Sequence, residues 1–133
     1  MMKGVTKMAE YLMGIDAGTG SVRVALFDFR GQNRAYAVAE YGTTYPKNGW
    51  AEQSDYEWFE ALKKAIPECI KKAGIAADNI AAITCDATTN TLVYLDENDT
   101  SVRPPILWMD VRATEEEYLI APIRAESDQS LLQ

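Results

Sequence analysis

The chain has 133 residues, of which 47% are hydrophobic and 25% charged, so it is long enough to bury a core and has the composition of an ordinary globular domain. Its formal net charge of −7 argues against nucleic acid or an anionic membrane as a partner, because both are bound through an excess of Lys and Arg. The sequence contains no histidine, which excludes Ser-His and Cys-His catalysis and imidazole metal sites.

The N-terminus and the cysteines indicate where the protein works. Residues 1–10 lack the apolar segment of a signal peptide, and we expect them to form a disordered leader. The alternative is an upstream start, with Met8 as a second candidate start. Cys69 lies in an amphipathic helical pattern and Cys85 closes an apolar run, so both are expected to be buried thiols in a reducing compartment. A cytoplasmic location follows from these expectations.

Three short strands are predicted first, over residues 11–15, 22–29 and 34–41, because these segments are apolar or alternating and are separated by turns. Strands joined by such short turns form an antiparallel meander. The turn between the first two strands is the glycine-rich loop 18–21, and Asp16 ends the strand that leads into it.

This hairpin has the residues that a phosphate site needs. Glycines let the backbone approach a ligand, small hydroxyls donate hydrogen bonds, and a carboxylate can hold Mg²⁺ directly or through water. The candidate residues are Asp16, Gly18, Thr19, Gly20, Ser21 and Arg23. The alternative is a plain hairpin, since glycine-rich turns between strands are common. We favour the phosphate site because an unpaired carboxylate at the end of an apolar strand is costly without a role.

A helix and a fourth strand follow. Ser54 and Glu57 fit a capping box, and Gly74 is a good C-terminal stop. One helical face is apolar, and its residues are Phe59, Leu62, Ile66, Cys69, Ile70 and Ala73. Residues 80–85 predict a buried strand, which can pair in parallel with the first strand through the helical crossover. The order β-β-β-α-β predicts an α/β fold of the ribonuclease H-like, actin-like ATPase class, with a mixed sheet in which a three-strand antiparallel meander is followed by βα elements.

Further short elements are predicted downstream, namely a strand over residues 92–95, a short extended piece over 105–108 and a second helix over 112–120. The segment from Asp86 to Thr91 follows the buried strand, at the place where α/β proteins gather ligands, and its hydroxyls suit a polyhydroxylated substrate. The alternative for it is a solvated loop.

Aromatic and charged residues gather in two other segments. Trp108 is an apolar platform flanked by Asp110 and Arg112, a mixture typical of sugar sites. The alternative is a core tryptophan beside an Asp–Arg pair that stabilises a helix start. For Trp50, which precedes the first helix, packing is the favoured interpretation.

Three segments in this order resemble the N-terminal lobe of the FGGY carbohydrate kinases. Asp16-Ala-Gly-Thr-Gly-Ser-Val-Arg-Val-Ala-Leu-Phe-Asp28 is similar to their first phosphate motif. Gly49-Trp-Ala-Glu-Gln53 is similar to their Gly-Trp-x-Glu-Gln segment, and Pro105-Ile-Leu-Trp-Met-Asp-Val-Arg-Ala113 to their Pro-x-Ile-Leu-Trp-x-Asp-x-Arg-Ala segment.

The resemblance implies transfer of the ATP γ-phosphoryl group to a sugar or polyol hydroxyl, with Mg²⁺. Asp16 would hold the metal, while Gly18, Thr19, Gly20, Ser21 and Arg23 would face the phosphates. Thr88, Thr89, Trp108 and Asp110 would line the sugar pocket. The xylulose kinases carry Gly-Gln-Met-His-Gly where this chain has Ala87-Thr-Thr-Asn-Thr91, whereas Asp86-Ala-Thr88 is more like the Asp-x-Thr of ribulokinases, which favours a ketopentose such as ribulose.

The same resemblance implies that this chain carries only part of a first lobe. Residues 11–121 would form a partial N-terminal domain, and 122–133 a truncated piece of it. No catalytic base is assigned, because the family's catalytic aspartate lies downstream of the matched region, so the isolated chain should be inactive and should self-associate through the face that the missing part covers. The alternatives are a non-catalytic sugar- or phosphate-binding module of actin-like fold, or another actin-like ATPase.

Overall fold

The computed structural model describes residues 10–118 and divides them into two compact units. Unit 1 comprises residues 10–43 and 54–90, and unit 2 comprises residues 44–53 and 91–118. The expectations for residues 1–9 of the leader and for the tail 122–133 lie outside the described residues. Within the described part, no helix has the length and hydropathy that crossing a membrane demands.

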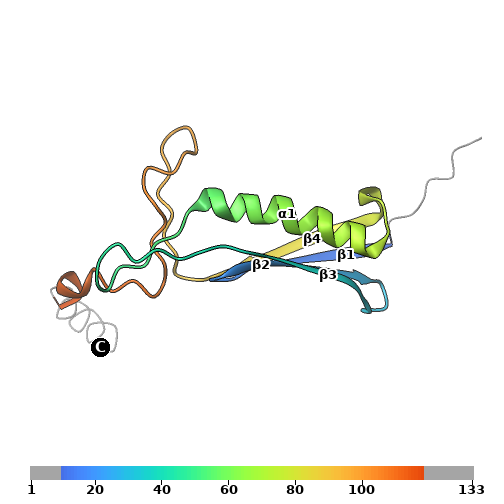
Figure 1. Cartoon of the computed structure of the whole chain (residues 1–133), viewed down its shortest axis with the longest axis horizontal. Coiled ribbons are helices and arrows are strands. Elements are labelled where there is room, and N and C mark those ends of the chain that lie inside the picture. Colours follow the sequence, from blue (N-terminus) through green and yellow to red (C-terminus); the bar gives the residue numbers. More distant parts are fainter. Residues whose placement is uncertain (1–9, 119–133) are drawn as a thin grey trace, which may run out of the picture. The chain divides into compact units, whose positions relative to one another are not determined.

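Unit 1 is built on a four-stranded mixed sheet (Figure 1). Its strands are β1 (Tyr11–Ala17), β2 (Ser21–Asp28), β3 (Asn33–Glu40) and β4 (Ile80–Ala87). The order across the sheet is β3-β2-β1-β4, with β1–β2 and β2–β3 antiparallel and β1–β4 parallel. The predicted meander and the predicted parallel crossover are both confirmed.

The crossover from β3 to β4 contains the helix α1 (Asp55–Ala73) and a short 3₁₀ turn, Ala77–Asn79. The Ser54 hydroxyl caps the helix by accepting from the Glu57 N–H at 3.4 Å. Gly74 ends it in the left-handed conformation, at φ 66°, which glycine adopts without steric cost. The predicted start and stop of this helix are confirmed.

Small residues allow α1 to lie close on β2 and β3 (Figure 1). The helix buries Ala61, Ala65 and Cys69, which recur every four residues, against Val22, Val24, Leu26 and the alanines of β3. Leu62, Ile66, Ile70 and Ala73 pack at the border of this core, as predicted. Phe59 was expected on the same face, but its side chain is 61% exposed because the centre of the contact falls on the alanine row.

β4 differs from the sequence-based expectation. It was predicted as a buried strand with a buried Cys85, yet all of its residues after Ile80 are exposed. The reason is its position at the edge of the sheet, next to β1, whereas α1 packs on β2 and β3. Cys69 is buried, as expected.

Unit 2 is held by isolated bridges in place of strands. Residues 92–95 were predicted as a strand, but only Leu92 and Leu95 form single bridges, to Ile106 and Ser101. The segment 105–108 contributes only the bridges of Ile106, one of which is to Glu52. Helical structure of the predicted second helix begins at residue 114 and continues to 118, beyond which the prediction lies outside the described residues.

Candidate functional site

The predicted phosphate loop is a tight connection between β1 and β2. The Gly18 N–H donates to the Ser21 carbonyl at 3.0 Å, which closes the turn. Two bonds from Tyr41 support the loop from outside, because its hydroxyl donates to the Gly18 carbonyl and its N–H to the Gly20 carbonyl. Sequence reasoning missed Tyr41. The signal was present in the strand order, because residue 41 directly follows β3, whose last residue pairs with Ser21.

The chain's own packing does not require glycine at positions 18 and 20. A Cβ added at Gly20 would meet nothing within 4 Å, and one at Gly18 would make only ordinary contacts, of 3.6 Å and longer. Neither glycine has the positive φ that would explain its presence. Open space beside a glycine-rich backbone is what a closely approaching ligand needs. Ser21 is buried, with 7% exposure, whereas Gly20 is exposed.

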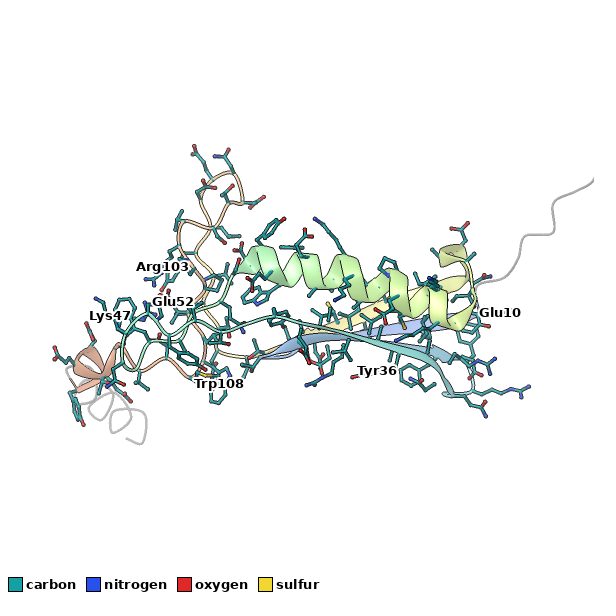
Figure 2. All side chains as sticks on the ribbon, viewed as in Figure 1. Glu10, Tyr36, Lys47, Glu52, Arg103 and Trp108 are labelled. Carbon is teal, nitrogen blue, oxygen red and sulfur yellow. The ribbon has the colours of Figure 1, made fainter. Side chains whose placement is uncertain are left out.

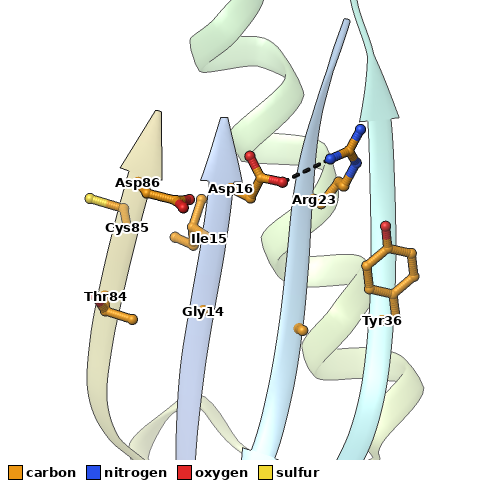
Figure 3. A pocket seen from close by; sticks show the side chains of 9 residues that line it. Gly14, Ile15, Asp16, Arg23, Tyr36, Thr84, Cys85 and Asp86 are labelled. Carbon is orange, nitrogen blue, oxygen red and sulfur yellow. Dashed lines mark hydrogen bonds and ion pairs between the residues drawn. The ribbon is translucent and has the colours of Figure 1, made fainter. Parts of the chain in front are cut away.

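Asp16 and Arg23 form an ion pair on the sheet face opposite α1 (Figure 3). Arg23 Nη1 lies 2.8 Å from Asp16 Oδ2, and the two side chains are 51% and 44% exposed. The argument that an unpaired buried carboxylate demands a role therefore does not apply, because the carboxylate has a cationic partner and reaches solvent. Both groups remain accessible to a ligand, since an exposed ion pair of this kind is weak, on the order of 0–1 kcal/mol.

A second carboxylate, Asp86, lies beside Asp16. The two residues are register partners at the ends of the parallel strands β1 and β4, so their side chains emerge on the same face (Figure 3). Both line an open cavity of about 380 Å³. The other residues that line it are Gly14, Ile15, Arg23, Ala25, Tyr36, Thr84 and Cys85. No role was assigned to Asp86 beyond its place in a polar segment, because its proximity to Asp16 depends on the register of the parallel pair.

Thr88 and Thr89 follow β4 directly. The Thr88 N–H donates to the Ala17 carbonyl at 3.0 Å, which places Thr88 next to the start of the phosphate loop. Thr89 is exposed. The structure therefore brings part of the predicted sugar segment to the same end of unit 1 as the hairpin.

The electrostatics around the loop affect Tyr41 as well. Burial, and secondly the nearby Asp16 carboxylate, raise the pKa of Tyr41 above its usual value of 10.0. Its hydroxyl is therefore a stable hydrogen-bond donor at neutral pH. The cavity itself contains two carboxylates and one guanidinium. A bound cation would reverse the local sign and so admit phosphate oxygens.

The donor set suits Mg²⁺ in part. Carboxylate and hydroxyl oxygens are its preferred ligands, and Asp16 and Asp86 offer them from one face. Among the described residues, no three acidic or sulfur-bearing side chains gather into a metal cluster. A magnesium ion here would keep several waters and share phosphate oxygens, which is its usual mode of binding with one or two carboxylates.

The other two predicted sugar residues, Trp108 and Asp110, lie in unit 2. Trp108 is 55% exposed, in keeping with a platform and not with a core tryptophan (Figure 2). The Asp110 side chain is 2% exposed and pairs with Arg112 at 2.6 Å. The hydrogen bonds from Arg112, the strongest influence, hold the pKa of Asp110 well below its usual range. The Asp–Arg pair weighed from the sequence is thus present.

Trp50 lies against two basic side chains of unit 2. The Arg112 guanidinium lies 3.8 Å from the centre of its ring and Lys47 Nζ lies 4.6 Å from it. Arg112 also pairs with Glu52 at 2.8 Å, as does Arg103, which is labelled beside Glu52 in Figure 2. Sequence reasoning assigned no role to Glu52 or Arg103, since nothing local brings residues more than 50 positions apart together.

Comparisons with known proteins agree on one family. Residues 11–130 match the domain described as FGGY family of carbohydrate kinases, N-terminal domain. Glycerol kinase of Oleidesulfovibrio alaskensis is 33% identical over 106 residues, which cover 79% of this chain and 21% of that protein. Xylulose kinase of Staphylococcus epidermidis is 36% identical over 104 residues, covering 77% and 21%.

Solved structures give the same result. The ligand-bound xylulose kinase from Lactobacillus acidophilus superposes with a TM-score of 0.79 at 27% identity, over 90% of this chain and 24% of that one. This likeness confirms the predicted fold class. The chain spans about a fifth of the length of the curated relatives that it matches.

Proposed function

The chain belongs to the FGGY family of carbohydrate kinases, and from this premise we propose that it supplies the phosphate-binding hairpin and part of the sugar pocket of an ATP-dependent kinase. The observation that carries the proposal is the loop between β1 and β2, which is open at Gly18 and Gly20 and flanked by the Asp16–Arg23 pair. Residues 11–121 would form part of the N-terminal domain, with 122–133 as a piece of the same domain.

The phosphate chemistry falls to unit 1. Thr19, Gly20 and Ser21, together with Gly18, would face the phosphates, and Arg23 would neutralise part of their charge. Asp16 would hold Mg²⁺, directly or through water. The metal would offset the negative charge of the two neighbouring carboxylates, Asp16 and Asp86, which otherwise repels phosphate. Tyr41 would keep the loop in its binding shape through its bonds to two loop carbonyls.

Sugar-binding roles fall to Thr88 and Thr89 in unit 1 and to Trp108 in unit 2, where Asp110 would support Trp108 through its contacts inside that unit. Apolar ring faces and hydroxyl donors are the groups that recognise polyols. We favour a ketopentose such as ribulose, because Asp86-Ala-Thr88 departs from the xylulose kinase pattern. Relatives named glycerol kinase and xylulose kinase make a triol and another ketopentose the main competitors.

The isolated chain should not phosphorylate a sugar. No residue in it is assigned as the base that takes the proton of the attacking hydroxyl, and the chain spans about a fifth of the kinases that it matches. The second candidate is a sugar- or phosphate-binding module of actin-like fold without transferase activity, which the open loop between β1 and β2 would also suit. In either case the partners are small molecules, and the two reduced cysteines fit a cytoplasmic location.

A coupled ADP-release assay tests the proposal. It would be run with Mg-ATP and with ribulose, xylulose and glycerol, on the 133-residue chain and on a polypeptide continued past Gln133 in its reading frame. Activity of the longer polypeptide alone would support a sugar kinase and identify the acceptor.

Two results would count against the proposal. Steady sugar-dependent ADP release by the 133-residue chain would contradict the expectation that this chain has no catalytic base. A folded longer polypeptide that binds sugar without turnover would favour the binding module. The Asp16→Asn variant is the matched control, because it should lose turnover while keeping the shape of the side chain.

A further inference from the structure

Trp108 sits at the tip of a two-residue insertion in a short antiparallel pairing inside unit 2. The Gln53 N–H donates to the Pro105 carbonyl, the Leu107 N–H to the Ala51 carbonyl, and the Val111 N–H to the Gly49 carbonyl. In the segment 49–53 the bonded residues are two positions apart, at 53, 51 and 49. In the segment 105–111 the bonded residues are 105, 107 and 111, so the second interval has two extra residues.

The extra residues form a β-turn. The Asp110 N–H donates to the Leu107 carbonyl at 3.0 Å, so the central positions are Trp108 and Met109. Leu107 is 2% exposed and anchors one end of the turn, while the nearly buried Asp110 side chain anchors the other. The fold therefore presents the indole outward from two fixed points.

The Asp110 carboxylate is saturated within unit 2. Its Oδ1 accepts from the Arg112 N–H at 3.0 Å and from Arg112 Nε at 2.8 Å. Its Oδ2 accepts from Arg112 Nη2 at 2.6 Å and from the Ala51 N–H at 2.7 Å. A carboxylate has about four lone-pair sites, and four donors fill them. No acceptor capacity is left for a sugar hydroxyl.

Arg112 is fixed from several sides. Its side chain is 14% exposed, its Nη2 also donates to Glu52 at 2.8 Å, and its guanidinium lies against the Trp50 ring. Arg103 provides a natural comparison, because it pairs with the same Glu52 oxygen, whereas the Asp110 carboxylate is bonded by Arg112 and Ala51. Arg112 directly follows one segment of the pairing and Glu52 belongs to the other, so the Arg112 guanidinium joins the two segments.

We propose that Arg112, held by Glu52 and Trp50, is the positioning residue that sets the Trp108 platform, and that Asp110 serves this clamp instead of contacting the sugar. The clamp is defined here as Glu52, Asp110 and Arg112 with the Trp50 ring. This assignment rests on the proposed role of Trp108 in sugar binding.

The indole N–H of Trp108 reports on the clamp without any ligand. It would be assigned in a proton–nitrogen correlation spectrum of the 133-residue chain with the Trp108→Phe variant, and its order measured by the heteronuclear Overhauser effect. Arg112→Lys keeps the charge but loses the planar fork, so the Trp108 indole should shift and lose order. Arg103→Lys is the matched control and should leave both unchanged.

Chemical rescue separates positioning from general stability. In Arg112→Ala, added methylguanidinium should return the Trp108 indole toward its wild-type position and order, while the amides of unit 1 stay constant. If Arg112→Ala does not fold, Glu52→Gln replaces it, and the indole should move in the same direction by a smaller amount. An unchanged, ordered Trp108 indole in the folded Arg112→Lys variant would overturn the proposal.

Sugar titration then tests the link to function. Because small misplacements of positioning groups cost up to about 10²-fold, we expect Arg112→Lys to weaken binding of ribulose, xylulose or glycerol by about tenfold relative to Arg103→Lys. Equal affinities in the two variants would overturn the link. If the wild-type chain binds none of these sugars, the sugar assignment under the proposed function fails, while the indole measurements still decide the clamp.

Discussion

At the scale of single residues, Tyr41 and the loop glycines decide whether the hairpin can receive a ligand. The tyrosine hydroxyl and N–H hold two loop carbonyls, which leaves the open side of the loop to the glycines. Loop shape and loop accessibility therefore depend on different residues and can be changed separately.

The glycine at position 20 can be tested for a ligand-binding role. A Cβ there meets nothing, so Gly20→Ala should change the free energy of unfolding by less than about 1 kcal/mol. It should nevertheless weaken binding of magnesium tripolyphosphate, because the methyl group occupies the approach to the backbone. Gly42→Ala is the matched control, since a Cβ at Gly42 also meets nothing. Calorimetric titration would measure the affinity of each variant for magnesium tripolyphosphate. Equal affinities of Gly20→Ala and Gly42→Ala would exclude Gly20 from the site.

The raised pKa of Tyr41 predicts a pH dependence. The buried phenol is favoured in its neutral form, so its contribution to stability is fully present below about pH 10, the ordinary tyrosine value, and is lost as the pH rises through the higher folded value. Absorbance titration should show a late ionisation step that is absent in Tyr41→Phe. In urea the pKa of Tyr41 should return to the ordinary tyrosine range. A pKa that stays raised in urea would contradict a cause in the folded structure.

At the scale of elements, local sequence predicted the parts whose structure is local. The cap at Ser54, the left-handed stop at Gly74 and the turns of the meander depend on residues within a few positions of one another. The burial of β4 was predicted wrongly, because an apolar strand looks the same in sequence whether or not a neighbouring layer covers it. Asp110 was recognised as polar and functional, but its saturation depends on Ala51, which is 59 positions away.

Gly49 gives the element-scale prediction. Its φ is +78°, and an added Cβ would lie 2.9 Å from Val111 Cγ2, so Gly49→Ala combines backbone strain with a clash in the paired segments of unit 2. Gly31 has the same φ but open space, so Gly31→Ala isolates the strain, about 1 kcal/mol or more. Urea unfolding should find Gly49→Ala the less stable variant. Equal stabilities would show that Val111 moves aside without cost.

At the scale of the whole molecule, β4 is the exposed feature with the clearest consequence. It is an edge strand without Lys or Pro, and Ile83 is 62% exposed. Edges of this kind pair with other chains. We therefore propose self-association of the isolated chain through this edge, visible as a concentration-dependent mass in light scattering.

A lysine placed at the edge should prevent this association. Ile83→Lys should be monomeric, whereas Phe29→Lys, at a similarly exposed site of 63% in the same unit, should associate like the wild type. A wild-type chain that stays monomeric at every concentration would contradict the proposal, as would association of Ile83→Lys that matches the wild type.

The most direct test of the account is a titration of the isotope-labelled chain with tripolyphosphate, with and without Mg²⁺, followed residue by residue by NMR. We predict magnesium-dependent shifts in the amides of residues 16–23, and their loss in Asp16→Asn without a change elsewhere in the sheet. Shifts that spread over the molecule, or that are the same in Asp16→Asn, would contradict a phosphate site built on this hairpin.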